Sequence, residues 1–145
     1  MMFYPSSELA MHAGYRSVEA FQVDQRRHNW PLKPVRKVQG KNYYNLNSLV
    51  MSHIISRLKT YGASGSGVNF LFERIEFEIL KDGIDEFAAG MHEELIITIP
   101  CYKLDIAETQ TVHFTRESAY KTLHECDALV IDLTDFINAI LSGHM

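Results

Sequence analysis

In the first half of the chain, apolar residues recur at the spacing of short amphipathic helices, and turns separate these segments. A first helix is predicted over residues 8–13, with Ser6 or Ser7 as its N-cap. Gly14 is expected to end this helix, because glycine adopts the positive φ that often follows a helix. Ala10 and Gly14 are small residues four apart, so a second helix is expected to cross the first closely after a tight turn.

The second helix is predicted over Val18–His28, with Ser17 as its N-cap. Its apolar positions are expected to face the core, and they are Val18, Phe21 and, less regularly, Val23. Its polar positions are expected to face outward, and they are Glu19, Gln22, Gln25 and Arg26. Phe21, Trp30 and Leu49 are interpreted as core residues rather than base-stacking groups.

Residues 30–34 contain two prolines three apart and cannot form the interior of a helix. Residues 35–44 follow as two short extended stretches around Gly40, which predicts a β-hairpin. A third helix is predicted next, with Asn45 or Asn47 as its N-cap. The apolar residues of this helix follow a 3.6-residue spacing, and they are Leu46, Leu49, Val50, Ile54, Leu58 and Tyr61.

The segment that opens the second half of the chain fits two kinds of element. A set of apolar residues lies on one face of a hypothetical helix, and they are Val68, Leu71, Phe72, Ile75 and Ile79. Residues 75–79 also alternate strictly between apolar and polar, as a half-buried strand would. A helix is preferred here, and the strand stays open as the alternative.

The remainder of the second half predicts alternating strands and helices. The three predicted strands cover residues 94–99, 111–114 and 128–133. Thr115 is expected to cap a helix that ends near Cys126, and Thr134 is expected to cap a last helix over residues 135–141. This half of the chain therefore predicts a small α+β module.

The net charge of the chain is −4, but its two halves carry net charges of opposite sign, which indicates two modules. Residues 1–62 hold nine Lys/Arg and three Asp/Glu, whereas residues 63–145 hold five Lys/Arg and fifteen Asp/Glu. A basic part next to an acidic part indicates a module for a polyanion joined to a module with another task. The Gly/Ser-rich residues 63–67 coincide with the sign change and predict a joint, which leaves residues 68–145 as the acidic module.

The composition indicates a folded chain, with 46% hydrophobic and 22% charged residues. Its apolar runs are too short for a membrane span, and its first residues lack the pattern of a signal peptide. We therefore expect a cytoplasmic protein that does not contact a membrane. Cys101 and Cys126 are expected to be reduced thiols, because two cysteines cannot form a disulfide framework.

The first module resembles the DNA-binding domain of MerR-type transcription regulators. The residues that carry the resemblance follow the family's order, and they are Glu8-Leu9-Ala10, Gly14, Ser17–His28, Pro31-Leu32-Lys33-Pro34, Gly40-Lys41-Asn42-Tyr43-Tyr44 and Arg57-Leu58-Lys59-Thr60-Tyr61-Gly62. The resemblance covers about residues 4–62 and implies a winged helix-turn-helix, followed by the acidic α+β module. The same winged fold occurs in phage excisionases and in small terminase subunits, which the chain is also similar to.

The resemblance and the placement of polar residues indicate a DNA-binding surface. Residues of the second helix and the turn before it are candidates for DNA contacts, and they are Arg16, Ser17, Gln22, Gln25, Arg26 and Arg27. Four of them are candidates for reading bases, and they are Arg16, Gln22, Gln25 and Arg26. Residues in and beside the hairpin are candidates for phosphate or minor-groove contacts, and they are Lys33, Arg36, Lys37, Lys41 and Tyr43, with Tyr44 as an alternative to Tyr43. Gln side chains match adenine and Arg side chains match guanine, which fits sequence-specific recognition.

The acidic module is expected to supply dimer contacts and is a candidate site for a small-molecule or protein effector. His124 and Cys126 lie close together in sequence, but no Cys-x-x-Cys or His-x-His spacing accompanies them or Cys101. The cysteines are therefore interpreted as buried thiols, and neither a metal nor a cofactor is expected. No phosphate loop and no Gly-x-Ser-x-Gly motif occurs in residues 62–67, so the chain is not expected to be an enzyme.

The leading hypothesis is a sequence-specific, DNA-binding transcription regulator that acts as a homodimer on double-stranded DNA. A homodimer is expected because one helix reads only a few base pairs, whereas two linked half-sites multiply the specificity. The alternatives are an architectural DNA-binding protein of the excisionase or small terminase type, and a protein-interaction module whose basic half binds an acidic partner.

Overall fold

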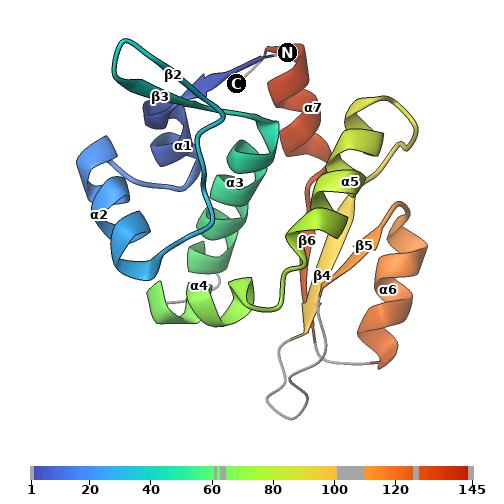
Figure 1. Ribbon diagram of the computed structural model, residues 1–145. Helices are drawn as coiled ribbons and strands as arrows, with labels where there is room; N and C mark the ends of the chain where they lie inside the picture. The colour runs from blue at the N-terminus through green and yellow to red at the C-terminus, as the bar shows by residue number, and fades with distance from the viewer. Residues whose placement is uncertain (1, 61, 63–64, 101–109, 126–127, 144–145) are drawn as a thin grey trace. The chain divides into compact units, whose positions relative to one another are not determined.

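The computed structural model describes residues 2–60, 62, 65–100, 110–125 and 128–143 (Figure 1). The chain divides into two compact units, Met1–Asn69 (unit 1) and Phe70–Met145 (unit 2). Each unit combines helices with a small sheet, which confirms a mixed α+β fold. Residues 63–69 carry no charge, so unit 1 keeps the basic excess and unit 2 the acidic excess. None of the helices in the described residues is long and apolar enough to cross a membrane.

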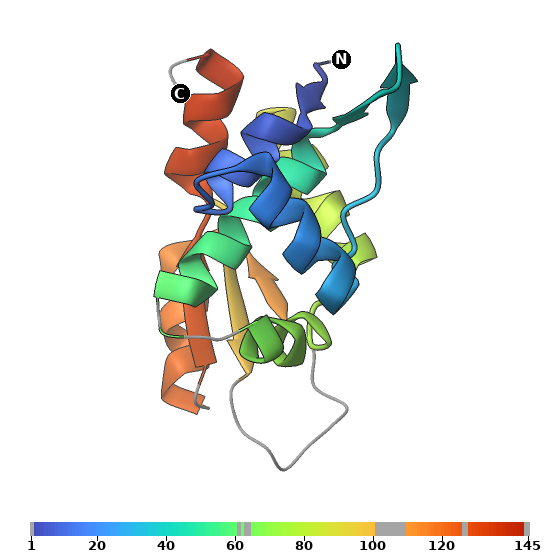
Figure 2. The same cartoon turned by 90° about the vertical axis from the view of Figure 1, so that its left-hand side faces the viewer.

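Unit 1 places two short helices and a three-stranded antiparallel sheet around a central helix. Its elements are β1 (Tyr4–Pro5), α1 (Ser6–His12), α2 (Val18–His28), β2 (Arg36–Val38), β3 (Lys41–Tyr44), α3 (Leu46–Thr60) and the first residues of α4 (Gly65–Phe72). The strand order is β1-β3-β2, so β3 is the middle strand. Figures 1 and 2 show the β2–β3 hairpin at the edge of this unit, extending past its helices.

The turn between α1 and α2 has the tight geometry that the sequence predicts. Gly14 adopts a φ of +83°, and a Cβ atom placed there would lie 3.4 Å from the Ser56 hydroxyl oxygen of α3. Glycine therefore satisfies both the positive φ and the close approach to α3. The N-cap prediction for α1 is wrong: Pro5 occupies that position without a side-chain hydrogen bond, and Ser6 and Ser7 lie inside the helix.

Helix α2 begins and ends at the predicted residues. The Ser17 hydroxyl oxygen accepts a hydrogen bond from the Ala20 backbone N–H at 3.2 Å, which confirms Ser17 as the N-cap. Phe21 is buried with 1% of its surface exposed, as predicted. Val23 is 45% exposed and does not face the core, so that prediction is wrong. Two residues after Phe21 correspond to about 200° of rotation, which turns Val23 to the opposite side of the helix.

The predicted hairpin around Gly40 is also confirmed. Gln39 and Gly40 both have positive φ angles, 51° and 78°, and Val38 pairs with Lys41 across a two-residue turn. Two positive φ angles in succession match the right-handed twist of the flanking strands, and glycine accepts the second without strain. Asn45, rather than Asn47, caps α3, because its side-chain oxygen accepts a hydrogen bond from the Ser48 N–H at 3.2 Å.

The core of unit 1 is built around α3. The buried residues of this helix are Ser48, Leu49, Val50, Met51, Ser52, Ile54, Ile55 and Leu58. Burying each large apolar side chain stabilises the fold by about 1.5–3 kcal/mol. Leu46 is only partly buried, and Tyr61 lies outside the described residues. Trp30 and Leu49 are buried, as the sequence predicts for core residues.

Unit 2 is organised around a three-stranded antiparallel sheet with the strand order β5-β4-β6. Its elements after α4 are α5 (Phe77–Ala88), β4 (Ile96–Pro100), β5 (Thr111–His113), α6 (Arg116–Glu125), β6 (Ala128–Asp132) and α7 (Thr134–Ser142). All three predicted strands are present within one or two residues of the expected ends. Helix α6 contacts every strand of the sheet and lies beside it in both ribbon views (Figures 1 and 2).

The single helix preferred for residues 68–79 is wrong, and so is the alternative strand at residues 75–79. Helix α4 begins at Gly65, inside the predicted joint, and ends at Phe72, whereas α5 begins at Phe77. Between the two helices the Glu76 N–H donates to the Gln110 side-chain oxygen, and the Gln110 amide nitrogen donates to the Glu76 carbonyl at 3.0 Å. Glu76 is the N-cap residue of α5, and its carbonyl also accepts a hydrogen bond from the Leu80 N–H at 3.1 Å. Its own N–H is bonded to Gln110 and its backbone angles are extended, so α4 does not continue into α5.

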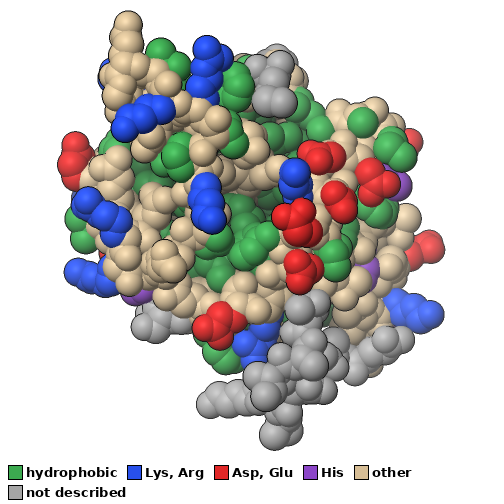
Figure 3. All heavy atoms as spheres, in the orientation of Figure 1, with side chains coloured by type: hydrophobic (Ala, Val, Ile, Leu, Met, Phe, Trp, Pro, Cys, Tyr) green, Lys and Arg blue, Asp and Glu red, His purple; other side chains and the backbone are tan. Residues whose placement is uncertain are grey.

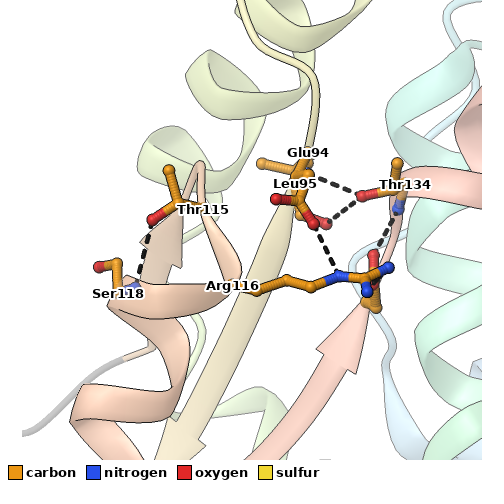
Figure 4. Close-up of polar contacts among 7 residues, drawn as sticks. Glu94, Leu95, Thr115, Arg116, Ser118 and Thr134 are labelled. Carbon is orange, nitrogen blue, oxygen red and sulfur yellow. Dashed lines mark hydrogen bonds and ion pairs between the residues drawn. The ribbon is translucent and has the colours of Figure 1, made fainter.

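The two predicted threonine caps have different outcomes (Figure 4). Thr115 caps α6, since its hydroxyl oxygen accepts a hydrogen bond from the Ser118 N–H at 3.2 Å. Thr134 does not cap α7: it begins the helix, and its own N–H donates to the Asp132 carboxylate at 3.0 Å. The Thr134 hydroxyl instead accepts a hydrogen bond from the Leu95 N–H at 2.9 Å, which ties the start of α7 to the residue before β4.

Candidate nucleic-acid interface

The predicted DNA-binding residues of unit 1 lie on α2, on the loop that follows it and on the β2–β3 hairpin. Most are exposed, and these are Arg16, Ser17, Gln22, Arg26, Arg27, Lys33, Arg36, Lys37 and Lys41. Gln25 and Tyr43 are partly buried. Figure 3 shows Lys and Arg side chains over α2 and over the hairpin. The exposed basic groups of this unit are therefore spread over a helix and a two-stranded hairpin.

Helix α2 presents a polar outer surface. Gln22 and Arg26 are one turn apart and share a face, because residues four apart lie above one another on a helix. The Gln25 amide nitrogen donates a hydrogen bond to the Leu32 carbonyl oxygen at 2.9 Å, which fixes the loop that carries Lys33. The Ser17 hydroxyl is engaged as the N-cap. Within the predicted set, the exposed side chains along the helix are thus Gln22, Arg26 and Arg27.

An aromatic cluster holds α2 against the rest of unit 1. The ring centroids of Tyr15 and Phe21 are 5.3 Å apart in an edge-to-face arrangement, and those of Phe21 and Trp30 are 6.3 Å apart. The Trp30 indole N–H donates a hydrogen bond to the Asn69 side-chain oxygen of α4 at 2.8 Å. Aromatic pairs of this geometry contribute about 0.5–1.5 kcal/mol beyond the burial of their area. The aromatic cluster therefore holds α2 in place while the outer face of the helix stays exposed.

A polar chain of three residues joins α2 to the end of α3. The Tyr15 hydroxyl donates a hydrogen bond to the Asp24 carboxylate at 2.6 Å, and the Lys59 ammonium donates to the Tyr15 hydroxyl. The Lys59 nitrogen lies 3.9 Å from the Asp24 carboxylate and 3.8 Å from the centroid of the Tyr15 ring. Burial, followed by the hydrogen bond to Asp24, raises the pKa of Tyr15. Burial lowers the pKa of Lys59, while the Asp24 charge opposes that shift.

This chain of contacts was not predicted from the sequence, although it orients the candidate helix. Tyr15 and Lys59 are 44 positions apart, so no local spacing relates them. The sequence shows only that Asp24 is an acidic residue in the middle of a helix that otherwise carries basic and amide side chains toward its end. This acid does not indicate Lys59 as its partner, because the two residues come close only through the packing of α2 against the rest of unit 1.

The hairpin carries basic residues on both of its faces. Arg36 is opposite Tyr43 and Val38 is opposite Lys41, so these pairs share one face, whereas Lys37 lies on the other. The Arg36 guanidinium carbon lies 5.5 Å from the centroid of the Phe3 ring, within the range of a cation–π interaction. A ribbon with cations on both faces and exposed β2 side chains can follow a groove or contact a phosphate backbone on either side.

Burial lowers the pKa values of two histidines in unit 1, His12 on α1 and His53 on α3. Burial, with the positive charges of Arg57 and His12, lowers the pKa of His53 to about 4. Burial also lowers the pKa of His12, against the opposing effect of Glu8. Both imidazoles are therefore neutral at pH 7 and add no charge to the basic surface.

The acidic unit contains no metal centre in the residues that the structure describes. No group of three or more His, Cys, Asp or Glu side chains there is arranged to hold a metal ion. His124 is exposed on α6, whereas Cys101 and Cys126 lie outside the described residues. The prediction that the two thiols are buried accordingly stays a prediction.

The chain was compared with protein-family models and with curated proteins, and neither comparison gives a match. The resemblance to MerR-type regulators therefore stays a prediction that rests on the order of the quoted residues.

Proposed function

We propose that unit 1 is a winged helix-turn-helix domain and that the chain is a sequence-specific DNA-binding transcription regulator. The observation that carries this proposal is the exposed polar face of α2 together with the basic β2–β3 hairpin, in a unit with nine Lys/Arg and three Asp/Glu. The order of elements supports it, since α1, the Gly14 turn and α2 precede the hairpin and α3. Such an arrangement offers one element for each groove of a duplex.

Helix α2 is the proposed reading element. A major groove of about 12 Å admits one α-helix, whose exposed side chains approach the base edges. Gln22 and Arg26 are exposed on one face of α2, and Arg16 lies exposed in the turn before it. Glutamine pairs with adenine and arginine with guanine through two hydrogen bonds, so these side chains supply the sequence preference.

The hairpin is the proposed anchoring element. Arg36, Lys37 and Lys41 are exposed on its two strands, and Tyr43 is partly buried on β3. Cations of this kind bind phosphates whatever the sequence, and each contact releases counterions from the duplex. The hairpin therefore contributes affinity and register, while α2 contributes discrimination between sequences.

A homodimer completes the proposal. One recognition helix reads only a few base pairs, and two helices bound about 34 Å apart on successive turns of DNA multiply the specificity. Unit 2, with five Lys/Arg and fifteen Asp/Glu, is repelled by the phosphate backbone and is the proposed source of dimer contacts. The excess charge also orients the molecule with unit 1 toward DNA.

The first experiment is fluorescence anisotropy of a labelled random duplex at about 50 to 200 mM salt, with the full chain as titrant. Micromolar binding at the low end, falling by orders of magnitude over this range, is the expected result, because several phosphate contacts release counterions. Lys121→Ala is the matched control, since Lys121 is exposed on α6 of unit 2. An absence of binding at low salt would overturn the proposal and favour an acidic protein partner.

Specificity is tested after a preferred site has been selected from a random library. Arg26→Ala is expected to weaken binding to that site by about 1–3 kcal/mol while random DNA is affected less. Equal losses on selected and random DNA would contradict a base-reading role for Arg26. Recovery of no preferred site, combined with strong bending of every duplex, would instead indicate an architectural protein.

A further inference from the structure

Unit 2 contains a cavity between α5 and the edge strand β5. Its volume is about 400 Å³, within the range of about 300–1,000 Å³ typical of small-molecule sites. Helix α5 contributes a continuous stripe of lining residues, which includes Ile79, Asp82, Gly83 and Glu86. The opposite wall includes Val112 of β5 and Phe114 just after it. The α5 wall thus carries two acids, while the opposite wall combines the polar Gln110 and Thr111 with the apolar Val112 and the aromatic Phe114.

Gly83 brings α5 close to the sheet at this cavity. A Cβ atom placed on Gly83 would lie 3.0 Å from a methyl carbon of Val112, which is closer than side chains normally pack. Glycine inside a helix costs about 1 kcal/mol relative to alanine. The short separation at Gly83 therefore accounts for a residue that weakens α5, and the cavity lies beside this point of close approach.

The two carboxylates in the lining are placed where they destabilise α5. Asp82 and Glu86 are one turn apart, and like charges at this spacing repel each other. Asp85 and Glu86 also lie in the last turn, where the helix dipole disfavours negative charge and no basic residue compensates. Figure 3 shows acidic side chains gathered over α5. A bound cation would relieve both effects.

The lining offers no protein cation to neutralise these acids. The residues that line the cavity include no Lys, Arg or His, and Asp82 forms no ion pair among the residues that the structure describes. The partner of Glu86 is His92, with 3.8 Å between the imidazole nitrogen and the carboxylate, and this pair is an ion pair only when His92 is protonated. His92 itself stacks on Phe114, with ring centroids 3.5 Å apart.

We propose that this cavity binds a small organic cation with an apolar body, of the class of arylalkyl amines. Asp82 and Glu86 would bind the ammonium group, while Ile79, Val112 and the Phe114 ring would contact the apolar body. A bare divalent cation fits less well, since no described group of three acidic or histidine side chains could hold a metal, and calcium needs six or more oxygen ligands. This proposal does not depend on DNA binding by unit 1.

The test is an NMR titration of the full chain with phenethylamine, in parallel with 2-phenylethanol, its neutral counterpart. Saturable shifts of the Gly83, Thr111 and Val112 amides are expected with the amine at millimolar concentrations, and the alcohol is expected to bind at least about tenfold more weakly. Equal affinities would show that the carboxylates play no part and would overturn the proposal. Shifts that do not saturate, or calcium chloride that displaces the amine at equal concentration, would also overturn it.

Variants of the acidic residues of α5 test which carboxylates bind the ammonium group. Asp82→Asn combined with Glu86→Gln is expected to weaken amine binding at least about tenfold, whereas Asp85→Asn, on the same helix but outside the lining, is expected to leave it unchanged. Removing the two like charges relieves repulsion in α5, so the double variant should melt at the wild-type temperature or above it. Equal weakening by Asp85→Asn would mean that the general acidity of the unit attracts the amine, and the site would be rejected. The comparison of amine and alcohol on the wild-type chain remains decisive if the double variant fails to fold.

Discussion

The two units differ in the position of the sheet relative to the core and in the sign of their charge. In unit 1 a central helix, α3, forms the core, and the β2–β3 hairpin carries exposed basic residues. In unit 2 the sheet is central, with strand β4 entirely buried, and acidic residues lie on helices α5 and α6. A projecting ribbon beside an exposed helix suits a long polyanion, whereas a cavity between a helix and a sheet edge suits a small ligand. The location of the core thus decides what kind of surface is left for binding.

The largest expected effect is on the free energy of unfolding of unit 1. It tests whether the aromatic cluster that packs against α2 stabilises this unit. Phe21→Ala should lower the free energy of unfolding by about 3–5 kcal/mol, because it removes the ring packed against Tyr15 and Trp30. Urea denaturation followed by tryptophan fluorescence reports on unit 1, which contains the single tryptophan. Val23→Ala, on the exposed side of the same helix, should change stability by less than about 0.5 kcal/mol. Similar losses for both variants would contradict the assigned packing.

The second-largest expected effect is on the affinity for DNA, and it tests the contrast between the basic unit 1 and the acidic unit 2. The triple variant Arg36→Ala, Lys37→Ala and Lys41→Ala should lower the affinity for random duplex DNA by about tenfold or more. It should also reduce the slope of log affinity against log salt by about 2.7, if each cation binds one phosphate. Anisotropy across a salt series measures both quantities. An unchanged slope would remove the hairpin from the proposed interface and leave α2 alone.

A pH effect should appear in unit 1 through His53. The pKa of His53 is about 4 in the folded state against 6.5 for the free side chain, so the unfolded chain binds the proton more readily. Stability is therefore full above about pH 6.5 and is lost as the pH falls toward 4, with about 1 kcal/mol lost between pH 7 and pH 5. Thermal melts followed by tryptophan fluorescence measure it. His53→Gln should flatten this dependence, and His124→Gln, at an exposed site on α6, should leave it intact.

The smallest effect concerns a feature that the two units share. Ser17 and Thr115 each accept a hydrogen bond of 3.2 Å from the backbone N–H three residues later, at the starts of α2 and α6. Ser17→Ala and Thr115→Ala should each cost about 1 kcal/mol of unfolding free energy. Urea denaturation measures both, with Ser17→Gly as a milder control that should cost only a few tenths of that. A clear difference between the two alanine variants would show that one cap is strengthened by its surroundings.

The sequence by itself determined the features that depend on neighbouring residues. The bounds of α2 follow from a serine cap, the hairpin from Gly40 and the turn from Gly14, and all three are confirmed. The three strands of unit 2 also follow from local alternation. Caps, positive φ angles and periodicity each involve only a few consecutive residues, so the chain carries that information locally. The separation of charge into two modules was likewise readable from the sequence.

The tertiary structure alone decided the features that join distant residues. The Glu76–Gln110 pair, which separates α4 from α5, joins positions 34 apart, and the Thr134–Leu95 bond, which takes Thr134 from its expected cap, joins positions 39 apart. The same holds for the link from Lys59 to Tyr15 and for the cavity beside Gly83. Each depends on which elements pack together, and packing is governed by shape and burial summed over the whole unit rather than by any short run of residues.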